Sequence, residues 1–292
     1  MDSVAAIRSF NRFYTERIGA LDERFLGQDR PLGEARLLFE IGKAGAPVAD
    51  LRTRLALDSG YVSRLLRRLE SAGLATTEAD PADGRRRIAR LTLAGEREWD
   101  TLDQLSDQQV RAIVGPLGER RAGQLADALT LAGRLVGAAS ITLEAVDARS
   151  DDAQRSMAAY FAELDDLFPT GFDPGDALTA DAHTYDPPAG TFVVAYTVDR
   201  QPVGCGGMWT MEPGTGEIKR MWVAPEWRGV GLAGRLLADL EGRSRACGHA
   251  RTVLDTNGVL HDAIAMYERS GYEPIERYND NPYAQRWFEK RW

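Results

Sequence analysis

The chain has 292 residues and a formal net charge of −8, and 43% of its residues are hydrophobic while 27% are charged. This composition is typical of folded domains, and no apolar run reaches the ~18 residues that a transmembrane helix needs. The first residues lack a basic segment followed by an apolar core, so the sequence predicts a cytoplasmic protein that does not contact a membrane.

The charge is unevenly distributed along the chain. Residues 1–140 carry 21 Lys/Arg and 20 Asp/Glu, whereas the remaining residues carry 15 and 24. Such asymmetry indicates two domains with different partners. The three histidines, His183, His249 and His261, show no ligand spacing, so the sequence predicts no metal site.

Apolar residues recur at helical spacing between residues 4 and 26, which predicts a first helix. Two interpretations of its apolar face remain open. The face packs either on a partner chain or within its own domain.

Two short helices are expected next, at 48–57 and 59–73. Pro47 suits the start of the first, and either Asp58 or Ser59 can cap the second. Two short helices joined by a tight turn are typical of a helix-turn-helix. The second helix carries polar side chains away from its apolar face, namely Ser59, Tyr61, Ser63, Arg64, Arg67 and Arg68.

A basic hairpin is expected after these helices. The Asp83-Gly84 dipeptide favours a tight turn, with Arg85, Arg86 and Arg87 at its tip and a strand at 88–93. A run of charges is usually a solvated surface. After a helix-turn-helix, the same run suits contact with DNA phosphates and the minor groove.

These segments resemble the MarR family of winged-helix regulators. Its Asp-x-Arg and Leu-Thr-x-x-Gly elements appear as Asp83-x-Arg85 and Leu91-Thr92-x-x-Gly95. The resemblance covers about residues 1–138 and implies a homodimer on a palindromic double-stranded DNA operator, with one recognition helix in each major groove. The DNA-binding residues it indicates are Ser59, Tyr61, Ser63, Arg64, Arg67, Arg85, Arg86 and Arg87. Helices at 95–114 and 118–137 would complete the dimer base.

Small residues at 137–140 mark the expected domain boundary, and residues 141–146 alternate like a strand. An amphipathic helix is expected at 153–168. The acidic, proline-rich segment 169–190 either forms one wall of a substrate mouth or is a solvated connection. Further strands are expected at 192–198, 203–211, 217–223, 252–256, 272–277 and 286–290.

The segment from Arg228 to Gly234 follows one of these strands and opens a helix. Backbone N–H groups at a helix N-terminus attract anions such as a pyrophosphate, and glycines allow a close approach. Taken alone, the pattern is about as compatible with an ordinary strand-to-helix loop.

The flanking residues resemble the GNAT superfamily of N-acetyltransferases. Arg228-x-x-Gly231-x-Ala233 resembles its acetyl-coenzyme A signature, and Ala263-x-x-x-Tyr267-x-x-x-Gly271-Tyr272 resembles its last helix and strand. The resemblance implies acetyl-CoA as acyl donor and no metal. The cofactor-binding residues it indicates are Met221, Trp222, Val223, Arg228, Gly229, Val230, Gly231, Leu232, Ala233, Gly234 and Asn257.

The same resemblance implies two catalytic residues. Tyr267 is predicted to protonate the departing thiolate, and Glu217 to act as a base, directly or through water. A core tyrosine and a strand-end carboxylate are the respective alternatives. One position departs from many relatives, since Leu260 stands where they have asparagine.

Together the two resemblances predict a multidomain protein. An α-rich winged helix-turn-helix domain (1–138) precedes an α+β GNAT acyltransferase domain (141–292) with a mixed, mostly antiparallel sheet. The predicted function is a DNA-binding regulator that is also an acetyl-CoA-dependent N-acetyltransferase acting on a small amine or amino acid. The alternative is a regulator whose second domain only senses acetyl-CoA or a metabolite.

Overall fold

The computed structural model describes residues 2–22, 24–81, 83–169, 171–173, 175 and 180–292. The chain divides into two compact units, Met1–Leu129 and Thr130–Trp292, and the division falls within helix α6 (Glu119–Ala139). No described helix is long and apolar enough to cross a membrane.

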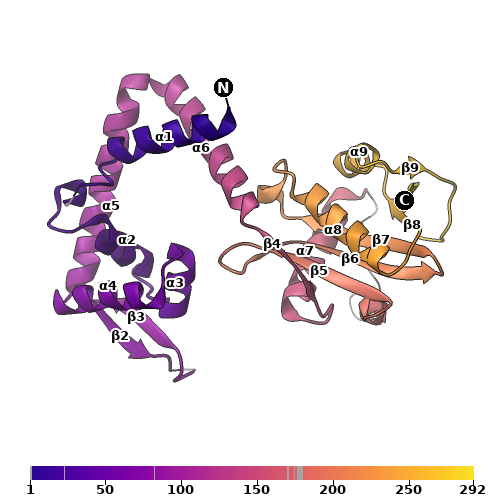
Figure 1. Ribbon diagram of the computed structural model, residues 1–292, viewed down its shortest axis with the longest axis horizontal. Helices are drawn as coiled ribbons and strands as arrows, with labels where there is room; N and C mark the ends of the chain where they lie inside the picture. The colour runs from indigo at the N-terminus through magenta and orange to yellow at the C-terminus, as the bar shows by residue number, and fades with distance from the viewer. Residues whose placement is uncertain (1, 23, 82, 170, 174, 176–179) are drawn as a thin grey trace. The chain divides into compact units, whose positions relative to one another are not determined.

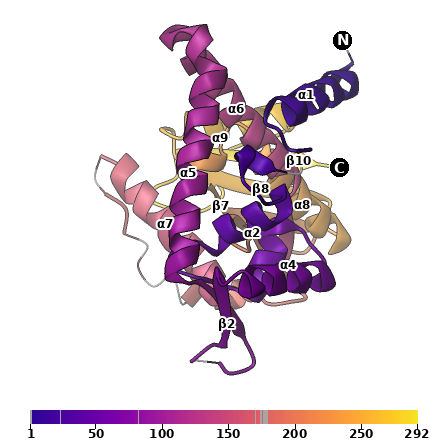
Figure 2. The same cartoon turned by 90° about the vertical axis from the view of Figure 1, so that its left-hand side faces the viewer.

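The first unit is mostly helical. Its longer helices are α1 (Ser3–Arg17), α2 (Leu32–Ile41), α3 (Val48–Leu55), α4 (Ser59–Ser71), α5 (Leu93–Val114) and the start of α6. Its three strands, β1 (Ala46–Pro47), β2 (Ala75–Ala79) and β3 (Arg87–Leu91), pair antiparallel in the order β1-β3-β2. Figures 1 and 2 show β2 and β3 extending from the helices as a wing.

The helix-turn-helix follows from local signals in the sequence. The Asp58 carboxylate accepts the Tyr61 N–H at 2.9 Å and so caps α4. The buried face of α4 consists of Val62, Leu65, Leu66 and Leu69, which join the core of this unit. The predicted winged helix-turn-helix fold is confirmed.

The Leu-Thr-x-x-Gly element has a clear physical role at the start of α5. The Thr92 hydroxyl accepts the Gly95 N–H at 3.1 Å and donates to the Gly73 carbonyl at 2.7 Å. A Cβ at Gly95 would lie 1.9 Å from the Leu74 carbonyl oxygen, so only glycine fits this close approach without a shift.

Two expectations for this unit need correction. The first helix ends at Arg17 rather than near residue 26, because Gly19 adopts a positive φ of 64° and ends the helical run. The first strand of the basic hairpin, β2, was not among the expected elements.

Helix α1 buries none of its residues, and its apolar side chains Ile7 and Phe13 are 60% and 65% exposed.

The second unit is built on a seven-stranded sheet in the order β4-β5-β6-β7-β8-β10-β9. Its strands are β4 (Thr142–Val146), β5 (Gly190–Tyr196), β6 (Pro202–Glu212), β7 (Thr215–Val223), β8 (Arg251–Thr256), β9 (Glu273–Pro274) and β10 (Arg286–Arg291). Only the β7–β8 pair is parallel. The predicted mixed, mostly antiparallel sheet is therefore confirmed.

Helices cover both faces of this sheet (Figure 1). Alternate residues of β5 separate the faces: Phe192 and Val194 pack with α7 (Asp151–Leu167), whereas Val193 packs with α8 (Leu232–Ala246) and α9 (His261–Arg269). A short helix, η4 (Ala180–Tyr185), precedes β5.

The parallel strands β7 and β8 pair only at their beginnings. Registered pairs run from Thr215 with Arg251 to Glu217 with Val253. After Glu217 and Val253, no further residues of β7 and β8 pair with each other. This separation of two neighbouring strands creates the space in which the candidate site lies.

Candidate functional site: a cavity between two diverging strands

A cavity of about 440 Å³ opens where β7 and β8 separate. From β7 it is lined by Ile218, Lys219, Arg220 and Met221, and from the end of β8 by Asp255, Thr256 and Asn257. Helix α9 and the segment before it add Leu260, Ala263 and Tyr267. The cavity therefore collects residues from β7, from the end of β8 and from α9, whereas the Arg228–Gly234 turn contributes none to its lining.

Strand β7 is irregular where it lines the cavity. Cys205 pairs with Trp222 and Gly207 with Lys219, so two residues of β7 oppose one of β6. Arg220 adopts a left-handed backbone conformation with a φ of 61°, which is uncommon for a residue with a side chain. Such a bulge leaves a backbone position unpaired in the ladder. The guanidinium of Arg220 lies 4.9 Å from the centre of the Phe161 ring.

The predicted cofactor turn lies between β7 and α8. Gly229 and Gly231 have φ values of 76° and 83°, a left-handed conformation that favours glycine. No side chain caps α8. Among the described residues, the first backbone N–H after Arg228 that meets an acceptor belongs to Arg235, which donates to the Gly231 carbonyl at 3.1 Å.

The turn is also sterically open. A Cβ built on Gly229, Gly231 or Gly234 would meet no heavy atom within 4 Å. Free N–H groups, the positive end of a helix dipole and open space together fit a pyrophosphate. The residues present therefore match the cofactor that the sequence predicts.

Arg228 turns its side chain back toward the strand rather than forward along the turn. Its Nε donates to the Val223 carbonyl at 2.8 Å, and its guanidinium pairs with Glu163. Trp222 donates its Nε1–H to the same Glu163 carboxylate at 2.9 Å. Arg228 and Trp222 thus hold the entry to the turn through one shared carboxylate on α7.

The C-terminal end of α6 contacts the same turn. Arg134 donates to the Arg228 carbonyl, and a Cβ on Gly137 would lie 3.0 Å from the Trp227 ring. Arg235 of α8 donates to the carbonyls of Ala138 and, at 2.8 Å, Ile141. Residues of α6 therefore contact the predicted cofactor turn, in addition to the strand and the helix that the turn connects.

Tyr267 is 6% exposed and lines the cavity. Its hydroxyl has no hydrogen-bond partner among the described residues, although its ring packs near Tyr272 and Phe288. Burial raises the pKa of this phenol well above its usual value, and the nearby Tyr160 and Asp255 reinforce the effect. The hydroxyl is therefore protonated at neutral pH and able to donate.

Glu217 is buried and does not line the cavity. Its carboxylate accepts from Trp209 at 2.7 Å and from Tyr278 at 2.8 Å, and Lys219 Nζ lies 3.2 Å away. Burial, followed by the Glu217 charge, raises the pKa of Tyr278, which keeps that donor protonated. The predicted base is thus enclosed by donors on the wall behind the cavity.

Asn257 lines the cavity but uses its amide within the chain. Its Nδ2 donates to the Tyr283 carbonyl at 2.7 Å, and its Oδ1 accepts the Val259 N–H at 3.0 Å. Asn257 therefore fixes the C-terminal loop at the end of β8 while it lines the cavity.

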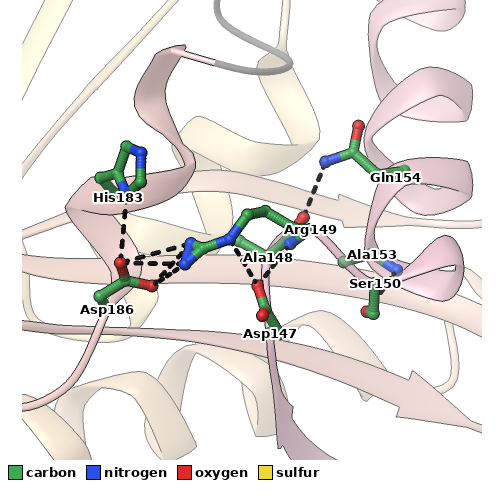
Figure 3. A network of polar contacts seen from close by, with 8 residues as sticks. All are labelled: Asp147, Ala148, Arg149, Ser150, Ala153, Gln154, His183 and Asp186. Carbon is green, nitrogen blue, oxygen red and sulfur yellow. Dashed lines mark hydrogen bonds and ion pairs between the residues drawn. The ribbon is translucent and has the colours of Figure 1, made fainter.

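The acidic segment 169–190 was expected to form either one wall of a substrate mouth or a solvated connection, and its described residues do some of each. Phe172, Asp173 and Gly175 line the cavity. Asp186 instead forms a bidentate pair with Arg149, its Oδ1 lying 2.8 Å from Nη2, while His183 Nδ1 lies 3.3 Å from Asp186 Oδ2 (Figure 3). Residues 176–179 lie outside the described residues.

In the first unit, the residues predicted to contact DNA form two exposed groups. On α4, Ser59, Tyr61, Ser63, Arg64 and Arg67 are exposed. Arg68, by contrast, pairs with Glu34 at 3.0 Å. On the wing, Arg85, Arg86 and Arg87 are all exposed, and Arg86 lies 3.5 Å from Asp83.

The comparisons with known proteins agree with this geometry. Residues 157–272 match the acetyltransferase (GNAT) family, and residues 28–86 match the MarR family. An IAA acetyltransferase of Azospirillum brasilense is 33% identical over 143 residues, which are 46% of this chain and 90% of that protein.

This chain belongs to the GNAT family. Its first unit carries a MarR-family domain, as the sequence predicted. An uncharacterized N-acetyltransferase of Schizosaccharomyces pombe is 33% identical over 108 residues, and the chain covers 66% of it, just under two thirds. A GNAT-family acetyltransferase structure from Staphylococcus aureus is 16% identical with a TM-score of 0.46, covering 52% of this chain and 98% of that one.

Several residues of the GNAT domain's cavity were missed from the sequence. They are Lys219 and Asp255 on the strands and Phe168 directly after α7. The alternation of apolar and charged residues along β7 could have indicated the position of Lys219. Ile218 belongs to the core under α8 and α9, so Glu217 and Lys219 had to face the other side. Among the described residues, no group of His, Cys, Asp or Glu is arranged to hold a metal ion.

Proposed function

We propose that this chain is an acetyl-CoA-dependent N-acetyltransferase acting on a small amine, joined to a domain that binds DNA as a dimer. The observation that supports the enzyme is the open, uncapped glycine turn at α8, which follows β7, one of the two strands that line the cavity. The relatives named above are acetyltransferases by name, which agrees with the same chemistry.

Acetyl-CoA would supply the thioester carbonyl. The acceptor ammonium first loses a proton to water, its nitrogen then forms the C–N bond, and the C–S bond breaks. A second proton leaves the nitrogen, and the thiolate gains one. The net change converts an ammonium and acetyl-CoA into an amide, free coenzyme A and one proton.

Tyr267 is proposed as the donor of the proton that the thiolate gains. Its hydroxyl is in the cavity wall, is uncommitted among the described residues and is protonated because of burial. A positioned acid of this kind contributes about 10²-fold or more to the rate. Solvent would return the proton to the phenolate after each turnover.

Glu217 is proposed to act at a distance from the acceptor. Its carboxylate meets Lys219 Nζ at 3.2 Å, and the same Nζ lies 3.5 Å from Asp255, which lines the cavity. Glu217 would therefore not contact the acceptor directly. A proton taken from the acceptor would reach it through water or through the Asp255–Lys219 pair.

The test of acyl transfer is release of coenzyme A with a panel of amines, using the full chain. Tyr267→Phe should lower turnover by about 10²-fold and leave acetyl-CoA affinity nearly unchanged, because the hydroxyl matters as charge develops on sulfur. Tyr272→Phe is the matched control, since this second buried phenol packs against the Tyr267 ring but does not line the cavity. Equal turnover in both variants would remove Tyr267 from the mechanism.

DNA binding is supported by the exposed face of α4 and by the arginines of the wing. The exposed apolar side chains of α1 support a dimer, because a monomer rarely leaves such a helix face uncovered. Two recognition helices would then contact half-sites about 10 bp apart. Sedimentation at micromolar concentration tests the dimer, and a monomer would remove the palindromic operator from the proposal.

The sensor alternative shares the cofactor turn and differs only in turnover. Tight acetyl-CoA binding without coenzyme A release for any amine would favour it. The uncommitted hydroxyl of Tyr267 in the cavity favours the enzyme.

A further inference from the structure

The cavity has an end that the cofactor residues do not account for. In the proposed reaction, the bulge of β7 and Tyr267 lie next to the thioester, while the glycine turn, which holds the pyrophosphate, is outside the cavity lining. The remaining lining comes from α7, the segment that follows it and the C-terminal loop, and consists of Tyr160, Leu164, Phe168, Phe172, Asp173, Asn281, Pro282, Tyr283 and Ala284. This end is available to the acceptor, and its composition indicates what the acceptor is.

Three aromatic rings form a continuous wall at this end. The ring centres of Phe172 and Tyr283 are 4.7 Å apart, those of Phe168 and Tyr283 are 5.8 Å apart, and those of Phe168 and Phe172 are also 5.8 Å apart. Phe172 and Tyr283 are only half-buried, so they retain ring surface for a ligand. A flat apolar group gains both area burial and ring-to-ring contact there.

Hydrogen bonds hold this wall in place. The Tyr283 hydroxyl accepts the Asp173 N–H at 3.0 Å, its carbonyl accepts from Asn257 at 2.7 Å, and its N–H donates to Asn281 at 3.1 Å. Because three hydrogen bonds already hold Tyr283 in place, little conformational entropy is lost from this wall when a ligand binds.

Asp255 provides the polar counterpart of the wall. Its side chain is 8% exposed, and Oδ2 accepts from Asn279, from Asn281 at 3.2 Å and from Lys219 at 3.5 Å. Oδ1 has no partner among the described residues. An ammonium group on the acceptor would complete the hydrogen bonding of this buried carboxylate.

The charges around Asp255 also favour a cation. Glu217 and Asp255 share the single ammonium of Lys219, which leaves an excess negative charge at this point. The other two charged residues of the cavity lining have opposite signs: Asp173 is exposed, and Arg220 stacks over Phe161. A neutral or anionic acceptor would leave the excess negative charge of Glu217 and Asp255 without a compensating cation.

We propose that the acceptor is a primary amine carried on an aromatic body, an arylalkylamine, with its ammonium bound by Asp255 and its ring against Phe172 and Tyr283. This assignment rests on the proposed acyl transfer. The ammonium bound at Asp255 is the form that loses a proton to water before the nitrogen attacks the thioester carbon.

The first experiment compares acceptors with the full-length wild-type chain. Coenzyme A release is measured with phenethylamine, butylamine, phenylalanine and spermidine. Phenethylamine should exceed butylamine in kcat/KM by about 10-fold, since only the former contacts the aromatic wall. A preference for phenylalanine would mean that Arg220 binds a carboxylate, and a preference for spermidine that charge alone selects the acceptor, so either result overturns the assignment.

The second experiment changes the two recognition elements separately. Asp255→Asn should raise the KM for phenethylamine by about 10- to 100-fold, the usual effect of losing a charged hydrogen bond. Asp166→Asn, the matched control at an exposed carboxylate of α7 that does not line the cavity, should leave it within about 2-fold. Phe172→Leu should reduce the preference for phenethylamine over butylamine while sparing butylamine turnover. An effect of Asp166→Asn that equals the effect of Asp255→Asn would overturn the role of Asp255.

Acetyl-CoA affinity, measured by calorimetry on every variant, separates the possible failures. Unchanged affinity shows that a variant is folded at the cofactor turn. Absence of acetyl-CoA binding in the wild type would refute the proposed function itself. Binding with equal kcat/KM for all four acceptors would refute the arylalkylamine assignment alone, whereas binding without coenzyme A release with any amine would refute the proposed acyl transfer and favour the sensor alternative.

Discussion

Replacement of Gly234 by aspartate places a carboxylate in the first turn of α8, beside the proposed pyrophosphate site. Gly234 is the third residue of this helix, and a Cβ there would meet no heavy atom within 4 Å. Its φ is not positive, unlike those of Gly229 and Gly231. The substitution therefore adds a charge without steric conflict or backbone strain.

The effect on folding should be favourable. Removing a glycine from a helix recovers part of the ~0.5–1 kcal/mol that glycine costs there. A carboxylate near a helix N-terminus adds about 0.3–1 kcal/mol through the helix dipole. The free energy of unfolding of Gly234→Asp should thus rise by about 0.5–1 kcal/mol.

The effect on acetyl-CoA should have the opposite sign. Two unit charges about 5 Å apart interact by ~1 kcal/mol in water and ~3 kcal/mol near a protein surface. A pyrophosphate carries about two charges, so the repulsion is at least ~2 kcal/mol, or about 30-fold in Kd. A variant that is more stable but binds less tightly cannot be explained by misfolding.

Calorimetric titration with acetyl-CoA measures this effect, and thermal unfolding measures the stability. Gly234→Asn is the matched control, because it has the same shape without the charge. The Kd of Gly234→Asp should approach that of Gly234→Asn as salt is raised. If the two variants bind acetyl-CoA within about 3-fold of each other at low salt, a difference below ~0.7 kcal/mol, the turn is not the phosphate site.

Three further predictions concern other parts of the chain. Arg85→Ala with Arg87→Ala should lower the slope of log Kd against log salt on a random-sequence duplex by about one per lost phosphate contact; an unchanged slope would exclude the wing from DNA binding. Gly95→Ala should destabilise the first unit by ~2 kcal/mol or more in urea unfolding, because its Cβ would meet a backbone carbonyl at 1.9 Å, whereas Gly84→Ala, with open space around it, should not. Burial lowers the pKa of His249, so the unfolded chain binds this proton more readily, and the free energy of unfolding should fall as pH drops below ~6.5; His249→Gln should weaken that fall.

Local signals made much of the fold predictable. Capping residues such as Asp58, the glycine at 95 and the alternation along β5 each act within a few residues, so their consequences can be deduced from the sequence. The two motif resemblances added the order of elements and the position of the glycine turn that opens α8. The family matches confirmed both resemblances.

The residue pairings around the cavity were not predictable for a physical reason. The Glu217 carboxylate is enclosed by Tyr278 and Asn279, which lie 61 and 62 positions away in the sequence. The contact between Asp173 and Tyr283 spans 110 positions. No periodicity or spacing encodes such pairs, because they form only when the C-terminal loop meets β7 and the segment after α7.

The contacts between the end of α6 and the cofactor turn affect how this chain can be dissected. A fragment that begins at residue 141 would lack the Arg134 side chain, the backbone of Gly137 and the Ala138 carbonyl that Arg235 binds. Such a fragment would keep every residue of the GNAT match but would leave the carbonyl of Arg228 without its donor. An acetyl-CoA affinity measured on it would describe a looser turn than the one the whole chain presents, so truncation should begin upstream of residue 130.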